Sequence, residues 1–276
     1  MQQEQLLGLH QDLLAILLDI QQVCDRHNIS FYLGEGSLLG AVRHQGFIPW
    51  DDDIDILMKR PDYERFLKIA PEELKDRCLV QHPSTVYPYW SSFIKTRAND
   101  PHPRFYQEHI RHLTPYCGPC VDIFPLEYVE KADSVGQRLQ FAQIRLYRRM
   151  IGYKLGVWHP FNLKTRIIKL MSYAFPFDWL QEHTAREMRR QGDSEKPYIA
   201  AFSTFHKYPC VVAPKEYYET EYVMYEGHRM PVPKGYDALL TKIYGDWHRI
   251  PDEKERSKAK HHYVSASPES VNQAEK

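Results

Sequence analysis

The sequence has no net charge, no long apolar run and few cysteines. Lysine plus arginine and aspartate plus glutamate each total 36 of 276 residues, so no overall positive field attracts nucleic acid. No apolar stretch approaches the roughly 20 residues that a membrane-spanning helix needs, and the first residues lack the basic start of a secretory signal. Five scattered cysteines do not resemble a disulfide framework. We therefore expect a cytoplasmic protein, free or peripheral on the inner face of the membrane, with no nucleic-acid partner.

The most informative segment that the chain does contain is Gly34–Met58, with the sequence GEGSLLGAVRHQGFIPWDDDIDILM. On an extended strand alternate side chains point to opposite faces, so Asp53 and Asp55 share one face and the isoleucines that follow them share the other. Two neighbouring carboxylates repel each other unless a cation lies between them. Because Mg²⁺ prefers carboxylate oxygens together with water and phosphate oxygens, the segment predicts a strand-borne magnesium site, with Mn²⁺ as the alternative metal, for a phosphate-bearing substrate.

The residues just before the acidic strand add a phosphate-binding feature. Gly36 and Ser37 open what the pattern predicts as a short helix over 37–43, and the first turn of a helix presents N–H groups to an anion. A run of aspartates is more often a solvated turn. The regular alternation of apolar and acidic residues favours the catalytic interpretation instead, since perturbed carboxylate pairs concentrate at functional sites.

The segment Ser37–Asp55 resembles a known family. A Gly-Ser turn, a short helix and an Asp-hydrophobic-Asp-hydrophobic strand resemble the active-site signature of the nucleotidyltransferase superfold. The full run, with its Arg-His and Pro-Trp pairs, is similar to the LicD family, and Met230–Pro233 and Tyr244–Trp247 extend the resemblance to about Leu13–His262. Members of that family transfer phosphocholine from CDP-choline to cell-surface glycans such as lipopolysaccharide, teichoic acid or capsule precursors, and the fukutin-related proteins transfer ribitol phosphate.

Two residues further along the chain gain a role from this resemblance. Asp122 interrupts the apolar segment Val121–Leu126, where a buried carboxylate needs a partner or a metal. In the superfold a third carboxylate at this place completes the metal-binding triad, or takes the proton of the acceptor hydroxyl. Lys95 lies in the strand pattern of Phe93–Arg97; strand lysines commonly reach solvent, but the resemblance favours a contact with phosphate.

The resemblance thus implies a metal-dependent phosphocholine transferase whose partners are CDP-choline, or a related CDP-alcohol, and a glycan or lipid-linked glycan acceptor. The implied metal ligands are Asp51, Asp53, Asp55 and Asp122, of which the last three are the implied catalytic residues, and the implied substrate-binding residues are Gly36, Ser37, Arg43, His44 and Lys95. Three alternatives remain open: a transferase of another CDP-linked alcohol phosphate (ribitol or glycerol phosphate), a true nucleotidyltransferase, and an inactive binding module of the same fold.

Cys117 and Cys120 form a Cys-Gly-Pro-Cys pair. A redox centre of the thioredoxin kind requires a surrounding fold pattern that this sequence lacks, and a structural zinc requires two more ligands. The residues that could supply them are Cys78, Cys210, His102, His109 and His112. We favour two free thiols over a zinc site.

The order of patterns predicts an α/β (α+β) fold, a nucleotidyltransferase-like mixed sheet flanked by helices with an added helical subdomain. We expect a catalytic core with an N-terminal helix at 1–132, a helical subdomain at 133–195, C-terminal strands and a helix at 196–264, and a disordered tail at 265–276. The expected helices span about 6–28, 61–70, 133–155, 163–174 and 235–244. The expected strands span 29–33, 78–81, 92–96, 121–126, 199–202, 211–213 and 222–225, with a loop at 101–120 and interruptions at Pro209, Pro214, Pro231 and Pro233.

Two apolar sets remain ambiguous. Residues 160–180 mix aromatic and aliphatic side chains with Lys164, Arg166 and Lys169, which is typical either of a buried helix or of a helix on a membrane surface; we favour core packing, although contact with the membrane would suit a lipid-linked acceptor. A choline trimethylammonium needs aromatic faces. The candidates for that contact are Trp50, Tyr89, Trp90, Tyr244 and Trp247.

Overall fold

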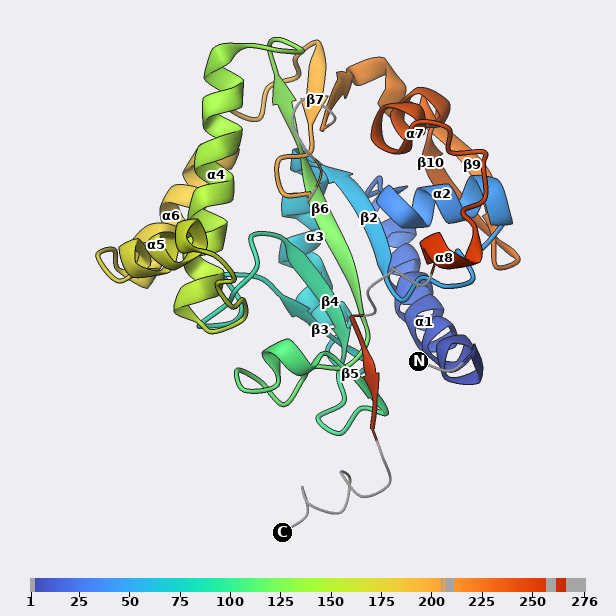
Figure 1. Cartoon of the computed structure of the whole chain (residues 1–276). Helices are drawn as coiled ribbons and strands as arrows, with labels where there is room; N and C mark the ends of the chain where they lie inside the picture. The colour runs from blue at the N-terminus through green and yellow to red at the C-terminus, as the bar shows by residue number, and fades with distance from the viewer. Residues whose placement is uncertain (1–2, 205, 207–210, 257–261, 267–276) are drawn as a thin grey trace.

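The computed structural model describes residues 3–204, 206, 211–256 and 262–266. Its centre is a mixed sheet in the order β1–β2–β6–β4–β3, and β7 and β8 continue it from the distal part of β6 (Figure 1). The strands are β1 Tyr32–Leu33, β2 Ile54–Lys59, β3 Cys78–Gln81, β4 Ile94–Ala98, β6 Cys120–Val129, β7 Tyr198–Ala200 and β8 Val212–Pro214. The β2–β6 pair is parallel and β4 is antiparallel to β6. The predicted α/β fold with a mixed, helix-flanked sheet is confirmed.

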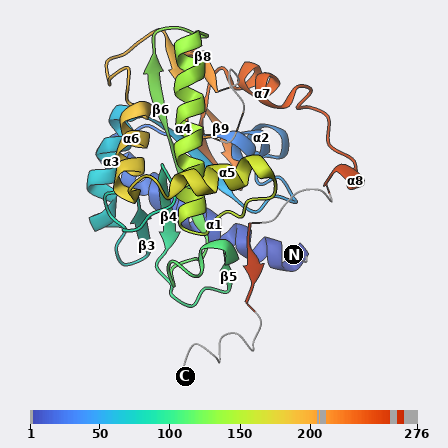
Figure 2. The same ribbon diagram turned by 60° about the vertical axis from the view of Figure 1, so that its left-hand side comes forward.

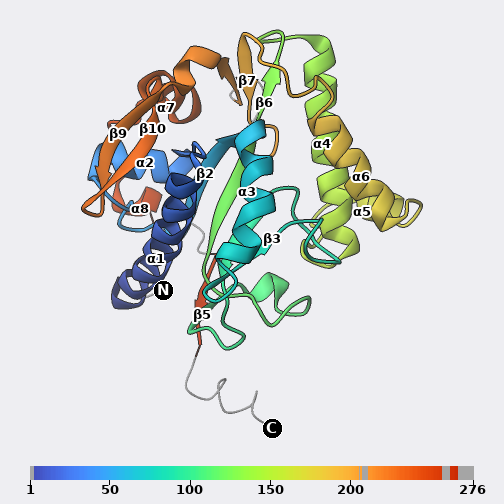
Figure 3. The ribbon, with the colours of Figure 1, turned by 180° about the vertical axis from the view of Figure 1, so that it is seen from behind.

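Helices cover the sheet from two sides. Helices α1 (Gln3–His27) and α3 (Arg60–Glu73) cross its back, as Figure 3 shows. The buried residues of α1 include Leu9, Leu13 and Leu17, each fully enclosed, as the amphipathic spacing predicts. None of the helices in the described part of the chain is long and apolar enough to cross a membrane.

A separate group of three helices lies beside the sheet (Figure 2): α4 Val135–Lys154, α5 Leu163–Ser172 and α6 Phe177–Met188. Ser134 caps α4 by accepting the N–H of Gln137, and Asn162 and Thr165 form a capping box on α5. The first two helices match the predicted spans. The sequence patterns missed α6, which starts after Pro176 inside a segment we treated as one aromatic-rich stretch.

The preferred core packing of residues 160–180 is wrong for most of α5. Only Thr165, Ile168 and Ser172 of this helix are buried. Its other apolar side chains face solvent, with Leu163 74% and Leu170 73% exposed. A short helix that packs against α4 along one narrow line buries few of its residues, and the remaining apolar face stays open.

The C-terminal third also differs from the prediction. Strands β9 (Thr220–Tyr225) and β10 (His228–Pro233) form a hairpin, and β10 includes both Pro231 and Pro233, which we expected to interrupt strands. Proline is tolerated there because β10 pairs with β9 alone among the described strands, so a missing N–H can face away from the ladder. Helix α7 (Tyr236–Tyr244) ends at Gly245 as predicted. The remaining short helices are η2 Lys215–Tyr218 and α8 Glu253–Arg256.

The expected loop at 101–120 contains a short strand, β5 (Phe105–Tyr106), and a 3₁₀ turn, η1 (Glu108–Ile110). Strand β5 pairs with β11 (Val264–Ser265), so Ser265, which we assigned to a disordered tail, is part of a strand. This pairing joins residues about 160 positions apart, and no local pattern reveals it. Residues 267–276, and also Pro209, Cys210 and His261, lie outside the described residues.

Helix α2 (Glu35–His44) delivers the chain from β1 to the acidic strand β2. Gly40 allows its close approach to the next loop, because a Cβ on Gly40 would lie 2.4 Å from the carbonyl oxygen of Gly46. The isoleucines of the acidic segment, Ile54 and Ile56, are fully buried in the core. The aspartates that alternate with them therefore face the other way, as predicted.

Candidate functional site

A cavity of ≈ 470 Å³ collects acidic side chains from two strands, with Asp53, Asp55 and Asp122 in its lining. Strands β2 and β6 are paired with Asp55 opposite Asp122, and β4 places Lys95 opposite Asp122 from the other side. Residues in register across neighbouring strands share one face of the sheet. The convergence of these three carboxylates, which the sequence could only suggest, is a property of this register.

The carboxylates of the acidic segment carry more negative charge than their surroundings balance. Burial raises the pKa of Asp53 to about 6, and the nearby carboxylates of Asp52 and Asp122 add to this while His262 opposes it. Burial, and next the charge of Asp53, hold the pKa of Asp55 well above its usual range. The same two causes raise the pKa of Asp51.

Asp51 lies on a smaller hollow of ≈ 210 Å³ that also borders Asp53 and Asp55. Gly36 lines this hollow as well, and a Cβ there would come within 2.7 Å of the Asp51 carboxylate, so only glycine leaves room for it. Glu35, at the start of α2 with φ 49°, forms an ion pair with His206 across the same hollow.

Ser37 is placed to position the acidic strand. Its buried hydroxyl oxygen accepts the backbone N–H of Asp55 at 2.9 Å, and the N–H of Gly34 donates to the carbonyl oxygen of Asp55 at 2.9 Å. These two bonds fix the first turn of α2 against β2. No side chain caps α2 at Gly34, so its N-terminal amides keep the anion-binding character that the sequence predicts. A contact of Ser37 with phosphate stays a prediction.

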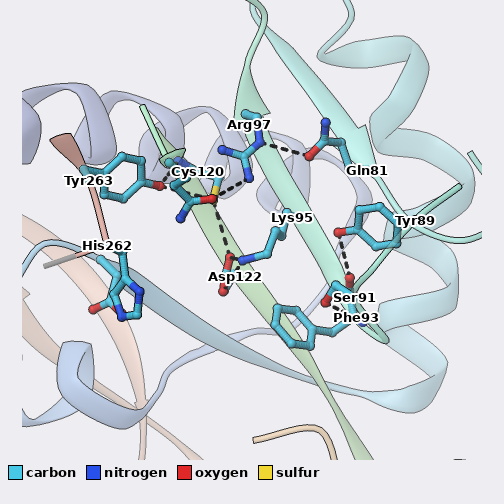
Figure 4. A network of polar contacts seen from close by, with 12 residues as sticks. Gln81, Tyr89, Ser91, Phe93, Lys95, Arg97, Cys120, Asp122, His262 and Tyr263 are labelled. Atoms are coloured by element: carbon cyan, nitrogen blue, oxygen red, sulfur yellow. Dashed lines mark hydrogen bonds and ion pairs between the residues drawn. The ribbon is translucent and has the colours of Figure 1, made fainter. Parts of the chain in front are cut away.

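The Lys95 side chain does not reach bulk solvent, and its ammonium group is already engaged by a carboxylate. Its Nζ lies 2.6 Å from each carboxylate oxygen of Asp122, in the wall of the larger cavity (Figure 4). Burial is the largest effect on Lys95 and lowers its pKa, but the charge and hydrogen bond of Asp122 together with Cys120 outweigh it, so the pKa is raised. Asp122 therefore has a balancing cation of its own, whereas no ion pair of the Asp51 or Asp55 carboxylate is seen among the described residues.

Arg43 and His44, which the resemblance implies as substrate-binding residues, point to a different place. The Arg43 guanidinium donates to the carbonyl oxygens of Trp247 (2.9 Å) and Arg249 (3.2 Å), and its Nε donates to His44 at 3.0 Å. Neither residue lines either of the two acidic cavities. Arg43 fastens the end of α2 to the segment after α7, and His44 contacts Arg43 and the Trp50 ring.

Three residues that the sequence patterns missed belong to this site. The backbone N–H groups of His262 and Tyr263 donate to the Asp52 carboxylate, and the His262 ring lies 3.9 Å from Asp53. Asp52, Asp53 and His262 could each offer a metal-ligating atom, with these atoms within 4.8 Å of one another. The contact between His262 and Asp52 joins residues 210 positions apart, so no local pattern predicts it. The one signal in the sequence is that the region of family resemblance ends at His262.

The thiols of Cys117 and Cys120 are free and have different partners. Cys117 donates to the carbonyl oxygen of Pro115 at 3.5 Å, and Cys120 lies 3.6 Å from Asp122 and 3.3 Å from the Tyr263 hydroxyl. Cys120 is thus part of the wall of the acidic cavity. The alternative zinc ligand Cys210 lies outside the described residues.

Aromatic side chains form the other wall of the larger cavity. Of the candidates for a choline contact, Trp90 lines it, Tyr89 packs behind Trp90 with ring centroids 4.8 Å apart, and Tyr244 lines the smaller hollow. Trp50 and Trp247 border neither cavity. The sequence did not single out the remaining aromatic lining residues, Phe93, Trp158 and Tyr263.

The donor set fits a hard divalent cation. Asp51, Asp53 and Asp55 supply carboxylate oxygens, the ligands that Mg²⁺ and Mn²⁺ prefer, and burial together with neighbouring carboxylates raises the pKa of each. Buried like charges are costly unless they are paired or coordinate a metal. The side chains present are therefore those that such a cation requires.

Residues 28–145 match the family model described as LicD/FKTN/FKRP, nucleotidyltransferase domain. The chain is 28% identical over 264 residues to the lipopolysaccharide cholinephosphotransferase LicD of Haemophilus influenzae, covering 92% of this chain and 94% of that protein. Over 60 residues it is 42% identical to an uncharacterised protein of Rickettsia typhi, covering 22% of this chain and 19% of that protein. The family resemblance stated from the sequence is confirmed.

Asp55→Asn is expected to stabilise the metal-free protein at high pH. A raised carboxyl pKa means that the folded state resists ionisation, so stability falls as pH rises from the usual Asp value of about 3.9 through the raised value. In EDTA at pH 8 the variant should melt about 2–4 °C above the parent, the effect of about 1 kcal/mol in a chain of this size, and the difference should shrink at pH 5. Differential scanning fluorimetry measures both.

The matched control for that comparison is Asp76→Asn, at an exposed position before β3, which should melt like the parent at both pH values. Added Mg²⁺ should raise the melting temperature of the parent more than that of Asp55→Asn. If Mg²⁺ stabilised both proteins equally, or if Asp55→Asn melted below the parent at pH 8, the interpretation that the Asp55 carboxylate is destabilising without a metal would be contradicted.

Proposed function

We propose that this chain transfers phosphocholine from CDP-choline to a hydroxyl of a cell-surface glycan, releasing CMP. Residues 28–145 match the LicD/FKTN/FKRP nucleotidyltransferase-domain model, and the chain is similar along nearly its whole length to a cholinephosphotransferase. The observation that carries the proposal is the meeting of Asp53, Asp55 and Asp122 at one cavity with an aromatic wall. The name of the Haemophilus relative favours lipopolysaccharide as the acceptor over teichoic acid or a capsule precursor.

The metal would be held by Asp51, Asp53 and Asp55, with Asp122 adjacent. When bound, a divalent cation supplies positive charge to the donor diphosphate and to the departing CMP, the electrostatic contribution that dominates phosphoryl-type transfer. On the protein side, the amides of the first turn of α2, where Glu35 and Gly36 line the smaller hollow, would face this diphosphate.

The remaining chemistry belongs to Asp122 and its partner. The acceptor hydroxyl gives its proton to an Asp122 carboxylate oxygen as its own oxygen attacks the phosphorus that bears choline, and the bond from that phosphorus to the CMP oxygen breaks with its electron pair leaving on CMP. Lys95, with its Nζ 2.6 Å from both Asp122 oxygens, fixes the orientation of the carboxylate for that step. The product is a phosphodiester.

The aromatic wall favours choline among the CDP-alcohols. A quaternary ammonium is held by ring faces with about 0.5–2 kcal/mol for each contact, and Trp90, Trp158 and Tyr263 present such surface beside the acidic centre. Ribitol or glycerol phosphate would gain more from hydrogen-bonding groups. Thermal shifts with CDP-choline, CDP-ribitol and CDP-glycerol separate these donors, and the largest shift should come from CDP-choline.

Asp53→Ala tests the function directly. With CDP-choline, lipopolysaccharide and Mg²⁺, the parent should release CMP and label the acceptor with phosphocholine, and the variant should lose about 100-fold or more of that rate, the scale on which removal of one transition-state contact acts. Chromatography of nucleotides and mass spectrometry of the acceptor measure both products, with Asp76→Ala as the control.

Each alternative function has its own outcome in this assay. Transfer of a nucleoside monophosphate to the acceptor without free CMP would indicate a nucleotidyltransferase. An inactive binding module would bind CDP-choline in the parent and in Asp53→Ala and turn over in neither.

Helix α5 supports a contact with an anionic membrane surface. Phe161, Leu163 and Leu170 are 82%, 74% and 73% exposed, and Ile167 lies between them on the same open face. Exposed Lys164 and Arg166 flank this face, a combination of apolar and basic residues that suits the interface of a bilayer with anionic lipids. A lipid-linked acceptor would then approach the cavities from the side of α5.

Leu163→Asp/Leu170→Asp should abolish that contact. In co-sedimentation with phosphatidylglycerol-containing vesicles the parent should bind, and the variant should lose about tenfold or more in bound fraction because its apolar face is gone. The control, Val135→Asp/Leu139→Asp, changes two apolar residues of α4 that are 75% and 64% exposed. Equal binding by the two variants, or equal binding of the parent to neutral vesicles, would argue against docking through α5.

A further inference from the structure

A second and larger cavity, of ≈ 680 Å³, adjoins the acidic site and is lined by basic side chains. Three of them are arginines of α4, Arg145, Arg148 and Arg149, and Lys164 joins them from α5. His159 lies between the two helices in the same lining. The described lining contains no carboxylate, in contrast to the cavity next to it.

The spacing of the arginines concentrates their charge. Positions i, i+3 and i+4 of a helix share one face, so the three guanidinium groups project from α4 toward one space. Like charges at this spacing destabilise a helix by a few tenths of a kcal/mol. Burial lowers the pKa of Arg148 to about 10, with Arg145 adding to the effect, and burial and then Arg149 lower the pKa of Arg145. Arg148 and Arg145 also lie over the Phe93 and Phe141 rings, with centroid distances of 5.9 and 5.5 Å.

The two cavities have a common wall. Arg148, Val157 and Trp158 line both of them. Trp158 can lie against α4 because residue 152 is glycine: a Cβ there would come within 2.4 Å of the indole ring. A ligand in the basic cavity therefore borders the space where Asp122 and Lys95 meet.

We infer that the basic cavity binds an anionic sugar of the acceptor, one that carries a phosphate or a carboxylate, and so presents a neighbouring hydroxyl to Asp122. Guanidinium groups match both anions through paired N–H donors, and the volume is that of an ordinary ligand pocket. This inference rests on the proposed function, because it assumes that the chain has a glycan acceptor. It places that acceptor in the basic cavity, beside the acidic site.

The first test measures binding of three sugars to the protein in EDTA: glucose 6-phosphate, glucuronate and glucose. Saturation-transfer NMR detects the binding of each sugar. At least one of the two anionic sugars should bind, and glucose should not. The anionic sugar with the higher affinity shows whether the cavity favours phosphate or carboxylate. Arg145→Gln/Arg149→Gln should lose about tenfold or more of that affinity. Both residues are only partly buried, and circular dichroism verifies that the variant is folded.

The control variant, Arg186→Gln/Arg190→Gln, removes the same charge from exposed arginines on and just after α6 and should bind the anionic sugars like the parent. Absence of binding by both anionic sugars, or an equal loss in the two variants, overturns the inference.

The second test is kinetic. In the transfer assay, Arg145→Gln/Arg149→Gln should raise the KM for lipopolysaccharide at least about tenfold more than the KM for CDP-choline, and equal changes in the two KM values would overturn the inference. Should the parent itself release no CMP, the proposed function fails, and the binding test decides the role of the cavity by itself.

Discussion

The burial of the Asp51, Asp53 and Asp55 carboxylates close to one another is the constraint on which the rest of the structure depends. These carboxylates are drawn from one short segment into the walls of two cavities, where burial raises the pKa of each. Such an arrangement costs stability, and the protein holds it with backbone contacts: Ser37 and Gly34 bind the main chain of Asp55. Asp122 differs because Lys95 balances its charge. The site thus has one carboxylate that is paired with a lysine and three whose pKa values are raised by burial and by one another.

The C-terminal part of the chain braces this site from the outside. Arg43 binds the carbonyls of Trp247 and Arg249, Asp52 accepts two N–H groups of the segment that leads into β11, and Glu226 in the β9–β10 turn accepts the N–H of Phe47. The acidic loop is therefore enclosed by residues more than 170 positions away.

The sequence was most informative where chemistry and local periodicity coincide. The acidic strand, the long helices α1 and α4, and the end of α7 at Gly245 follow from alternation, amphipathic spacing and turn residues. Position in the sheet could not be derived in this way. The register that places Lys95 opposite Asp122 makes a predicted phosphate ligand an ion-pair partner. His262 enters the site through a contact with Asp52, 210 positions away in the sequence. The exposed face of α5 was misjudged because the composition of a helix does not reveal how much neighbouring surface is available to cover it.

The most direct measurement is anomalous diffraction from crystals grown with Mn²⁺ and CDP-choline. The account predicts a manganese peak at coordinating distance from the carboxylates of Asp53 and Asp55, with the donor diphosphate beside it and Lys95 still paired with Asp122. Manganese bound elsewhere, or a nucleotide that occupies a cavity without contact to the acidic strand, would contradict it.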